Sequence, residues 1–194
     1  LVKGASEGAG LGNKFLSHIR EVQIIAHVVR AFADENVIKE GSVDPKTDYD
    51  TINTELILAD LQTLLKQKDS KAVKTDPVKK SAVEKLFKAL NEGNAARDVQ
   101  LTDEEKESVR DLFLLSNKPE VIVLNVDEES LNNAEQIADK YAELLGVSKD
   151  KFVVICAKIE SELASLSDEE QKEYLKDLGL EASGLERLIQ KAYE

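Results

Sequence analysis

An amide and two carboxylates follow a short apolar run in the C-terminal half of the sequence. Residues 121–124 read Val-Ile-Val-Leu, and Asn125, Asp127 and Glu128 occupy three of the next four positions. An amide can donate and accept hydrogen bonds, whereas a carboxylate accepts from amino groups of the kind that distinguish one purine from another. The residue types and spacing therefore predict recognition of a nucleotide base. The alternative is that Asn125 and Asp127 only cap a helix expected to begin near residue 131.

A second short segment lies at the corresponding place after the next apolar run. Residues 152–156 are expected to form a strand that ends in a small-residue loop, Cys156-Ala157-Lys158. Ligands of open α/β folds bind at the carboxyl ends of parallel strands, so two neighbouring loops of this kind strengthen the prediction of a base site. Cys156 is expected to be a buried small hydrophobe, because no histidine or other activating base lies nearby.

Strand and helix patterns alternate in the two parts of the chain that flank residues 34–116. Residues 24–29 are continuously apolar and predict a parallel strand buried on both faces. A helix with Phe15, Leu16, Ile19 and Val22 on one face is expected before that strand. A further helix over 131–145 ended by Gly146, a capping box at Ser167 and Glu170, and two C-terminal helices complete the pattern of a parallel α/β sheet.

The middle of the chain shows no strand pattern. Ile52, Leu56, Ala59 and Leu61 recur at helical intervals, and a second helical pattern follows over residues 78–90. The charged connection 68–77 between them predicts a helical hairpin, and a capping box at Thr102 and Glu105 predicts a further helix that runs through residue 114. We therefore expect two domains, an α/β domain over 1–33 and 117–194 and a helical insertion over 34–116.

Composition limits the class of protein. Of the 194 residues 42% are hydrophobic, and no apolar run approaches the roughly 18 to 20 residues that cross a bilayer. With its single cysteine and no secretory pattern, the chain is expected to be cytoplasmic and not to partner a membrane. The net charge of -12 argues against broad binding to DNA, although clusters of lysine in the helical region could contact phosphate. Because Leu1 stands first and methionine is absent, we expect a processed or truncated chain.

Several segments along the chain follow the order of motifs in one known family. The segments are residues 1–6 with 8–16, Asp44-Pro45, residues 51–56, residues 59–61, Asn125-Val126-Asp127-Glu128, residues 178–181, and Gly184-Leu185. In these motifs the chain resembles the Obg-like ATPases, the YchF family of translation-associated P-loop proteins. Residues 1–16 resemble the second switch region, and residues 125–128 resemble the family's Asn-x-x-Glu variant of the GTPase base motif.

The resemblance implies a fold, ligands and a partner. The fold is α/β: part of a P-loop NTPase domain of the Ras-like or Obg type, with a parallel sheet and an inserted α-helical hairpin domain. ATP is implied in preference to GTP, with Asn125, Val126 and Glu128 against adenine. Cys156, Ala157 and Lys158 complete the implied base pocket. The implied partner is the ribosome, as the large subunit or the 70S particle.

Catalysis is the weakest part of the sequence pattern. By resemblance, Leu1 stands where Ras-like proteins place the glutamine that orients water, which a leucine cannot do. His18 is a candidate relay, although a packing or capping role is the favoured interpretation, and His27 is expected to be a core histidine. No phosphate loop of the Gly-x-x-x-x-Gly-Lys-Ser/Thr type occurs, so the ligands of Mg²⁺ are expected outside this sequence, with no metal site within it. We predict that this chain alone does not hydrolyse ATP. The alternative function is a non-catalytic helical module that binds a macromolecular partner.

Overall fold

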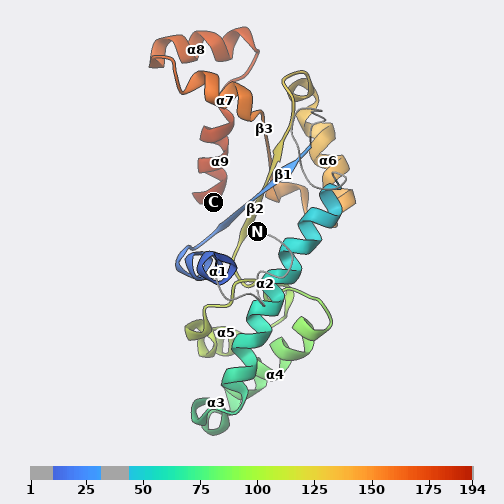
Figure 1. Cartoon of the computed structure of the whole chain (residues 1–194), viewed down its shortest axis with the longest axis vertical. Helices are drawn as coiled ribbons and strands as arrows, with labels where there is room; N and C mark the ends of the chain where they lie inside the picture. Colours follow the sequence, from blue (N-terminus) through green and yellow to red (C-terminus); the bar gives the residue numbers. More distant parts are fainter. Residues whose placement is uncertain (1–10, 32–43, 194) are drawn as a thin grey trace. The chain divides into compact units, whose positions relative to one another are not determined.

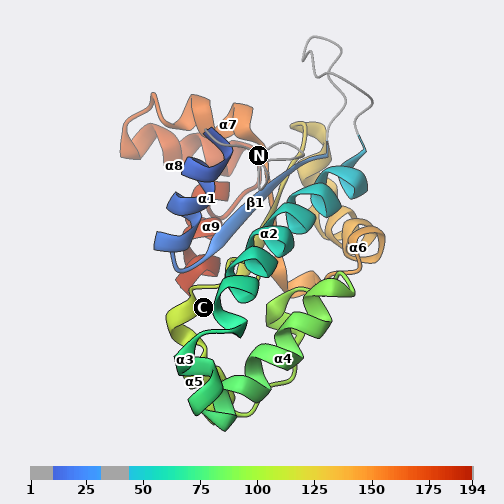
Figure 2. The ribbon, with the colours of Figure 1, turned by 60° about the horizontal axis from the view of Figure 1, so that its bottom comes forward.

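The computed structural model describes residues 11–31 and 44–193 and divides them into two compact units (Figures 1 and 2). The helical unit contains residues 11–25 and Asp50–Pro119. The sheet unit contains residues 26–31, 44–49 and 120–193. The domain boundaries expected from the sequence stay a prediction.

A three-stranded parallel sheet organises the sheet unit. Its order is β1 (Ile25–Arg30), β2 (Glu120–Asn125) and β3 (Phe152–Ile155). Strand β3 pairs with β2 in a parallel register that joins Ile122 to Phe152 and Asn125 to Ile155. Ala31 N donates to Asn125 O at 2.8 Å on the β1 side of β2. The α/β class and the parallel arrangement predicted from the sequence are confirmed.

Strand β1 differs from the prediction in its burial. Val29 is 3% exposed, whereas Val28 is 63% exposed, so only one face of β1 is covered. The covered face packs on the sheet core, and the His27 ring lies 4.8 Å from the Tyr49 ring. The prediction that both faces are buried is wrong, because the described residues cover only the face that carries Val29 and leave Val28 on the opposite face exposed.

Helices cover both faces of the other two strands. Helix α6 (Ala134–Leu145) packs against the cluster that contains Ile122, Leu124 and Phe152, and α9 (Gly184–Tyr193) contacts β3 and β2 from the other side (Figure 1). The helix predicted over 131–145 is divided into a 3-10 turn, η3 (Glu129–Asn133), and α6, because Asn133 leaves the helical conformation. Gly146 ends α6 at a φ of 67°, as predicted.

The remaining elements of the sheet unit follow β3. A 3-10 turn, η4 (Lys149–Lys151), leads into β3, and α7 (Ala157–Leu163) and α8 (Asp168–Asp177) lie between β3 and α9. The predicted capping box of Ser167 and Glu170 is present at the start of α8. Cys156-Ala157-Lys158 was expected to be a loop, but α7 begins at Ala157, where Glu160 N bonds to Cys156 O at 3.1 Å.

The helical unit is built from α1 (Leu11–Glu21), most of α2 (Pro45–Lys68), α3 (Lys71–Thr75), α4 (Pro77–Asn91) and α5 (Asp103–Ser108), with the 3-10 turns η1 (Ala96–Asp98) and η2 (Arg110–Leu112). Side chains of α2 and α4 share one core that includes Leu64, Leu86 and Leu90. The charged connection between them contains α3, because Ser70 caps it and Val73 is buried.

Two predictions for the helical unit differ from the structure. Helix α5 ends at Ser108 rather than continuing through residue 114, because η2 follows it and Phe113 takes a left-handed conformation at a φ of 47°. On α1, Leu16 is buried as expected, whereas Phe15 is 48% exposed. Val22 follows the end of α1 and is 47% exposed.

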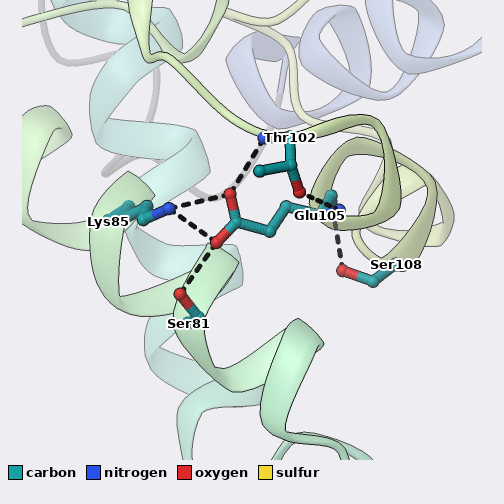
Figure 3. Close-up of polar contacts among 5 residues, drawn as sticks. All are labelled: Ser81, Lys85, Thr102, Glu105 and Ser108. Atoms are coloured by element: carbon teal, nitrogen blue, oxygen red, sulfur yellow. Dashed lines mark hydrogen bonds and ion pairs between the residues drawn. The ribbon is translucent and has the colours of Figure 1, made fainter.

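The predicted capping box of α5 is part of a larger network around Glu105 (Figure 3). Glu105 Oε1 accepts from Ser81 Oγ at 2.8 Å and from Lys85 Nζ at 2.7 Å. Glu105 Oε2 accepts from Thr102 N at 3.0 Å, and Glu105 N donates to Thr102 Oγ1 at 3.2 Å. The Lys85 ammonium and the other donors lower the pKa of Glu105 to about 2. The network links α4 to α5.

The Glu105 network predicts a dependence of stability on pH. A carboxylate with a lowered pKa stabilises the folded state above its unfolded pKa, and that stabilisation is lost as the pH falls toward the folded value. We expect the free energy of unfolding to decrease between pH 4.5 and about pH 2, and Glu105→Gln to lack this part of the decrease. Urea titrations at stepped pH measure it, with the exposed Glu107→Gln as the control. Equal pH dependence in wild type and Glu105→Gln would contradict the prediction.

Candidate functional site

A cleft of about 960 Å³ opens at the carboxyl ends of β2 and β3, within the sheet unit. It is lined by the segment after β2, the start of α7 and the loop after α8. All six residues predicted to contact a base are among its lining residues: Asn125, Val126, Glu128, Cys156, Ala157 and Lys158. The parallel register of β2 and β3 brings the two segments together, because both strands end at the same edge of the sheet.

Asn125 joins the two segments. Its Oδ1 accepts a hydrogen bond from Ala157 N at 3.0 Å, and Val126 N donates to Ile155 O at 2.8 Å. The side chain thus braces the first turn of α7 instead of capping the turn that follows β2. Val126 is 2% exposed and packs in the sheet core, which anchors the start of the segment.

The carboxylates of Asp127 and Glu128 have different surroundings. Asp127 Oδ1 accepts from Ser130 N at 2.9 Å, and hydrogen bonds from Ser130 lower the pKa of Asp127. The turn after β2 is therefore capped by Asp127. The Glu128 carboxylate lies 3.8 Å from Lys158 Nζ, and both side chains are largely exposed, at 47% and 72%. An exposed pair of this kind contributes little, so Glu128 is available to accept hydrogen bonds from a ligand.

The start of α7 forms the other polar side of the cleft. Cys156 is 3% exposed and packs with Ile159, Leu163 and Leu175, which agrees with its expected role as a small hydrophobe. Lys158 extends into solvent beside Glu128. The lining of the cleft therefore includes the carboxylates of Asp127, Glu128 and Glu129, the ammonium group of Lys158 and main-chain groups fixed by the sheet.

The loop between α8 and α9 is the part of the site that the sequence patterns missed. Leu178 and Leu180 line the cleft and pack against the Cys156 cluster. The Leu-Gly-Leu pattern of residues 178–180 could have indicated a helix end, but nothing in the sequence places that end beside the strand termini.

Helix α9 begins at a close approach to β3. The Glu160 carboxylate accepts from Gly184 N at 2.7 Å and from Leu185 N at 3.1 Å. A Cβ atom at position 184 would lie 2.7 Å from the Ile155 side chain, so glycine is required there for space. The contact fixes the start of α9 beside the strand that leads into the cleft.

The catalytic candidate His18 is not among the residues that line this cleft. Leu1 lies outside the described residues, and His18 is an exposed side chain on α1 of the helical unit. His27 is buried in the sheet unit against Tyr49, as expected of a core histidine.

Clusters of metal-ligating side chains and membrane-spanning helices are both absent from the described ranges. Over residues 11–31 and 44–193, no group of three or more His, Cys, Asp or Glu side chains is placed to hold a metal ion. Within the same ranges, no helix is both long enough and apolar enough to span a membrane.

Comparison with known proteins relates the whole chain to one group. No family model matches the sequence. It is 44% identical over 207 residues to the ribosome-binding ATPase YchF of Bacillus subtilis (strain 168), and 41% identical over 201 residues to that of Escherichia coli O157:H7. Each match covers 100% of this chain and 55% of the relative. The chain thus spans about half the length of these curated relatives.

A solved structure matches the fold over almost the same extent. The structure of the Schizosaccharomyces pombe YchF GTPase has a TM-score of 0.73 and 28% sequence identity to this chain. The match covers 98% of this chain and 55% of the yeast chain.

Proposed function

The chain belongs to the YchF family, and we propose from that premise that it is the base-recognition part of a ribosome-associated ATPase that prefers ATP to GTP. The observation that carries the proposal is the cleft at the ends of β2 and β3. In it Asn125 Oδ1 braces α7 and Asp127 caps a turn, whereas the carboxylates of Glu128 and Glu129 are exposed. Of these two, Glu128 stands at the last position of the Asn-x-x-Glu motif.

Base selection follows from the chemistry of Glu128. Adenine carries an amino group where guanine carries a carbonyl oxygen, and a carboxylate accepts from the first and repels the second. The roles that we propose are adenine contact by Asn125, Val126 and Glu128, with Cys156 to Lys158 completing the pocket. Lys158 would release Glu128 when the base enters, at little cost because the pair is exposed.

Hydrolysis in this proposal belongs to the full-length protein. The triphosphate and Mg²⁺ would be held by groups outside the described residues, and bound Mg²⁺ would neutralise charge on the phosphates. The contribution of this chain is to hold the base, and with it the position of the nucleotide. A leucine at position 1 cannot orient the attacking water, and we propose that the chain by itself is inactive.

The ribosome is the proposed partner, in the cytoplasm. The relatives are named for ribosome binding, and residues 66–88 of the helical unit contain eight lysines against three acidic residues in a chain of net charge -12. All three acids are already engaged, since Asp69 pairs with Lys74, Glu84 pairs with Lys80 at 4.0 Å, and Asp76 caps α4. Exposed lysines such as Lys66, Lys71 and Lys88 are thus suited to contact with RNA phosphate. More specifically, we propose that the contact is with the large subunit or the 70S particle.

A second candidate function is a helical interaction module that uses no nucleotide. It is favoured by one observation: the helical unit has a core of its own, formed around Leu64, Leu86 and Leu90. In that case the sheet unit would only support the helices.

One experiment separates the two functions. The full-length protein is titrated with ATP and with GTP in the presence of Mg²⁺ by calorimetry, and its co-sedimentation with ribosomes is measured. We expect tighter binding of ATP than of GTP, together with co-sedimentation. Ribosome binding by a protein that takes up neither nucleotide would instead support the helical module.

A further inference from the structure

The cleft has one side that no proposed contact uses. Its polar sides come from the segment after β2 and the start of α7, whereas its third side is formed by Leu178 and Leu180. Leu131, from the turn after β2, also lines the cleft and packs in the same cluster as these two leucines. The site thus has polar groups at the strand ends and an apolar wall beside them.

A helix-end motif places the wall. Gly179 has a φ of 70°, Gly179 N bonds to Lys176 O at 3.0 Å, and Leu180 N bonds to Leu175 O at 2.9 Å. This is the Schellman arrangement, in which a left-handed glycine turns the chain back on the last helical turn. No atom lies within 4 Å of a Cβ built on Gly179, so glycine is needed there for its conformation and not for space. The turn brings the side chains on both sides of Gly179 to the cleft.

The two leucines are anchored on one side and open on the other. Both pack against the buried cluster of Cys156, Ile159 and Leu175, where α7 and α8 lie side by side (Figure 1). Neither side chain is fully buried, so apolar surface remains exposed on the cleft side. Apolar surface at a site of this kind is stabilised when a flat apolar ligand group covers it.

We infer that Leu178 and Leu180 form the wall against which the purine ring packs, so that the plane of the ring is set by the loop after α8 while its edge is read by Glu128. The inference rests on the proposed function. A purine face is the same for adenine and guanine, so the wall contributes affinity for both bases, and Glu128 contributes the choice between them.

The separate roles of the apolar wall in affinity and of Glu128 in base selection are tested in the full-length protein with Leu180→Ala. We expect the affinities for ATP and GTP to fall by a similar factor, about tenfold each, because several carbon atoms are lost from a partly covered apolar contact. The ratio of the two affinities stays at the wild-type value. Binding of inorganic tripolyphosphate, which has no base, is unchanged.

Two further variants separate a contact with the base from a general loss of structure. Leu180→Met keeps the apolar volume and is expected to bind both nucleotides as wild type does. Leu144→Ala removes a leucine that is 42% exposed on α6 and does not line the cleft, and it is expected to leave all three affinities unchanged.

Each outcome decides the inference. Unchanged nucleotide affinity in Leu180→Ala, a shift in the ATP-to-GTP ratio, or an equal loss of tripolyphosphate binding overturns it. If wild type itself binds neither nucleotide, the proposed function fails as well. If the wild type binds ATP and Leu180→Ala binds it equally well, only the inference about the apolar wall is rejected, and the proposed function stands.

Discussion

Asp60→Ala is expected to lower the free energy of unfolding by about 3 kcal/mol. Asp60 lies on α2 and is 0% exposed. Its Oδ1 accepts from Leu115 N at 2.7 Å, and its Oδ2 accepts from Ser116 N and Ser116 Oγ, both at 2.7 Å. Alanine would leave two buried main-chain donors without a partner, at a cost of roughly 1–3 kcal/mol each.

Part of that loss is offset, because burial of the carboxylate is itself unfavourable. Burial raises the pKa of Asp60 in spite of the three hydrogen bonds. Denaturant titration measures the effect, with Asp69→Ala as the matched control in the same unit. Asp69 is 85% exposed and pairs with an exposed lysine, so its loss should cost less than about 1 kcal/mol. Equal stability of the two variants would show that Asp60 does not hold residues 115 and 116 in place.

Glu128→Ala is expected to reduce the preference of the full-length protein for ATP over GTP by about 10- to 100-fold. A hydrogen bond to a charged group contributes roughly 1.5–3 kcal/mol, and alanine also removes the charge that repels the guanine carbonyl. The change should appear as weaker ATP binding, with GTP binding equal or tighter. Calorimetric titration with each nucleotide measures the ratio.

Glu129→Ala is the matched control for this prediction. Glu129 is the next residue, is exposed and lines the same cleft, so it carries equal charge to nearly the same place. We expect it to leave the preference unchanged. Glu128→Asp keeps the charge but shortens the side chain, and it should lose part of the preference because the hydrogen bond lengthens. Unaltered selectivity in Glu128→Ala would remove Glu128 from base recognition.

Features that depend on near neighbours were predictable. The two capping boxes, at Thr102 with Glu105 and at Ser167 with Glu170, each join residues three apart and form as predicted. Gly146 ends α6 in a left-handed conformation, which glycine adopts readily because it has no Cβ atom. The cleft residues after β2 and β3 were also predictable, since parallel strands end at one edge of a sheet whatever their exact register.

Features that depend on partners distant in the sequence were not predictable. Thr102 and Glu105 predict a helix start, but only the fold adds Ser81 and Lys85 from α4 to that carboxylate. The apolar run of residues 24–29 predicts a strand, but which face is covered depends on the elements that pack on it, and Val28 is exposed.

The sequence by itself determined the order of strands and helices, the two capped helix starts, and which residue types stand at the strand ends, because those depend on local hydrogen bonds and on periodicity. Tertiary structure alone decided which partners those residues meet. Asp60 holds main-chain groups 55 and 56 residues away, and Leu178 and Leu180 reach the cleft from a helix end far along the chain. Such contacts join residues by packing in three dimensions, and no local pattern of residue types encodes them.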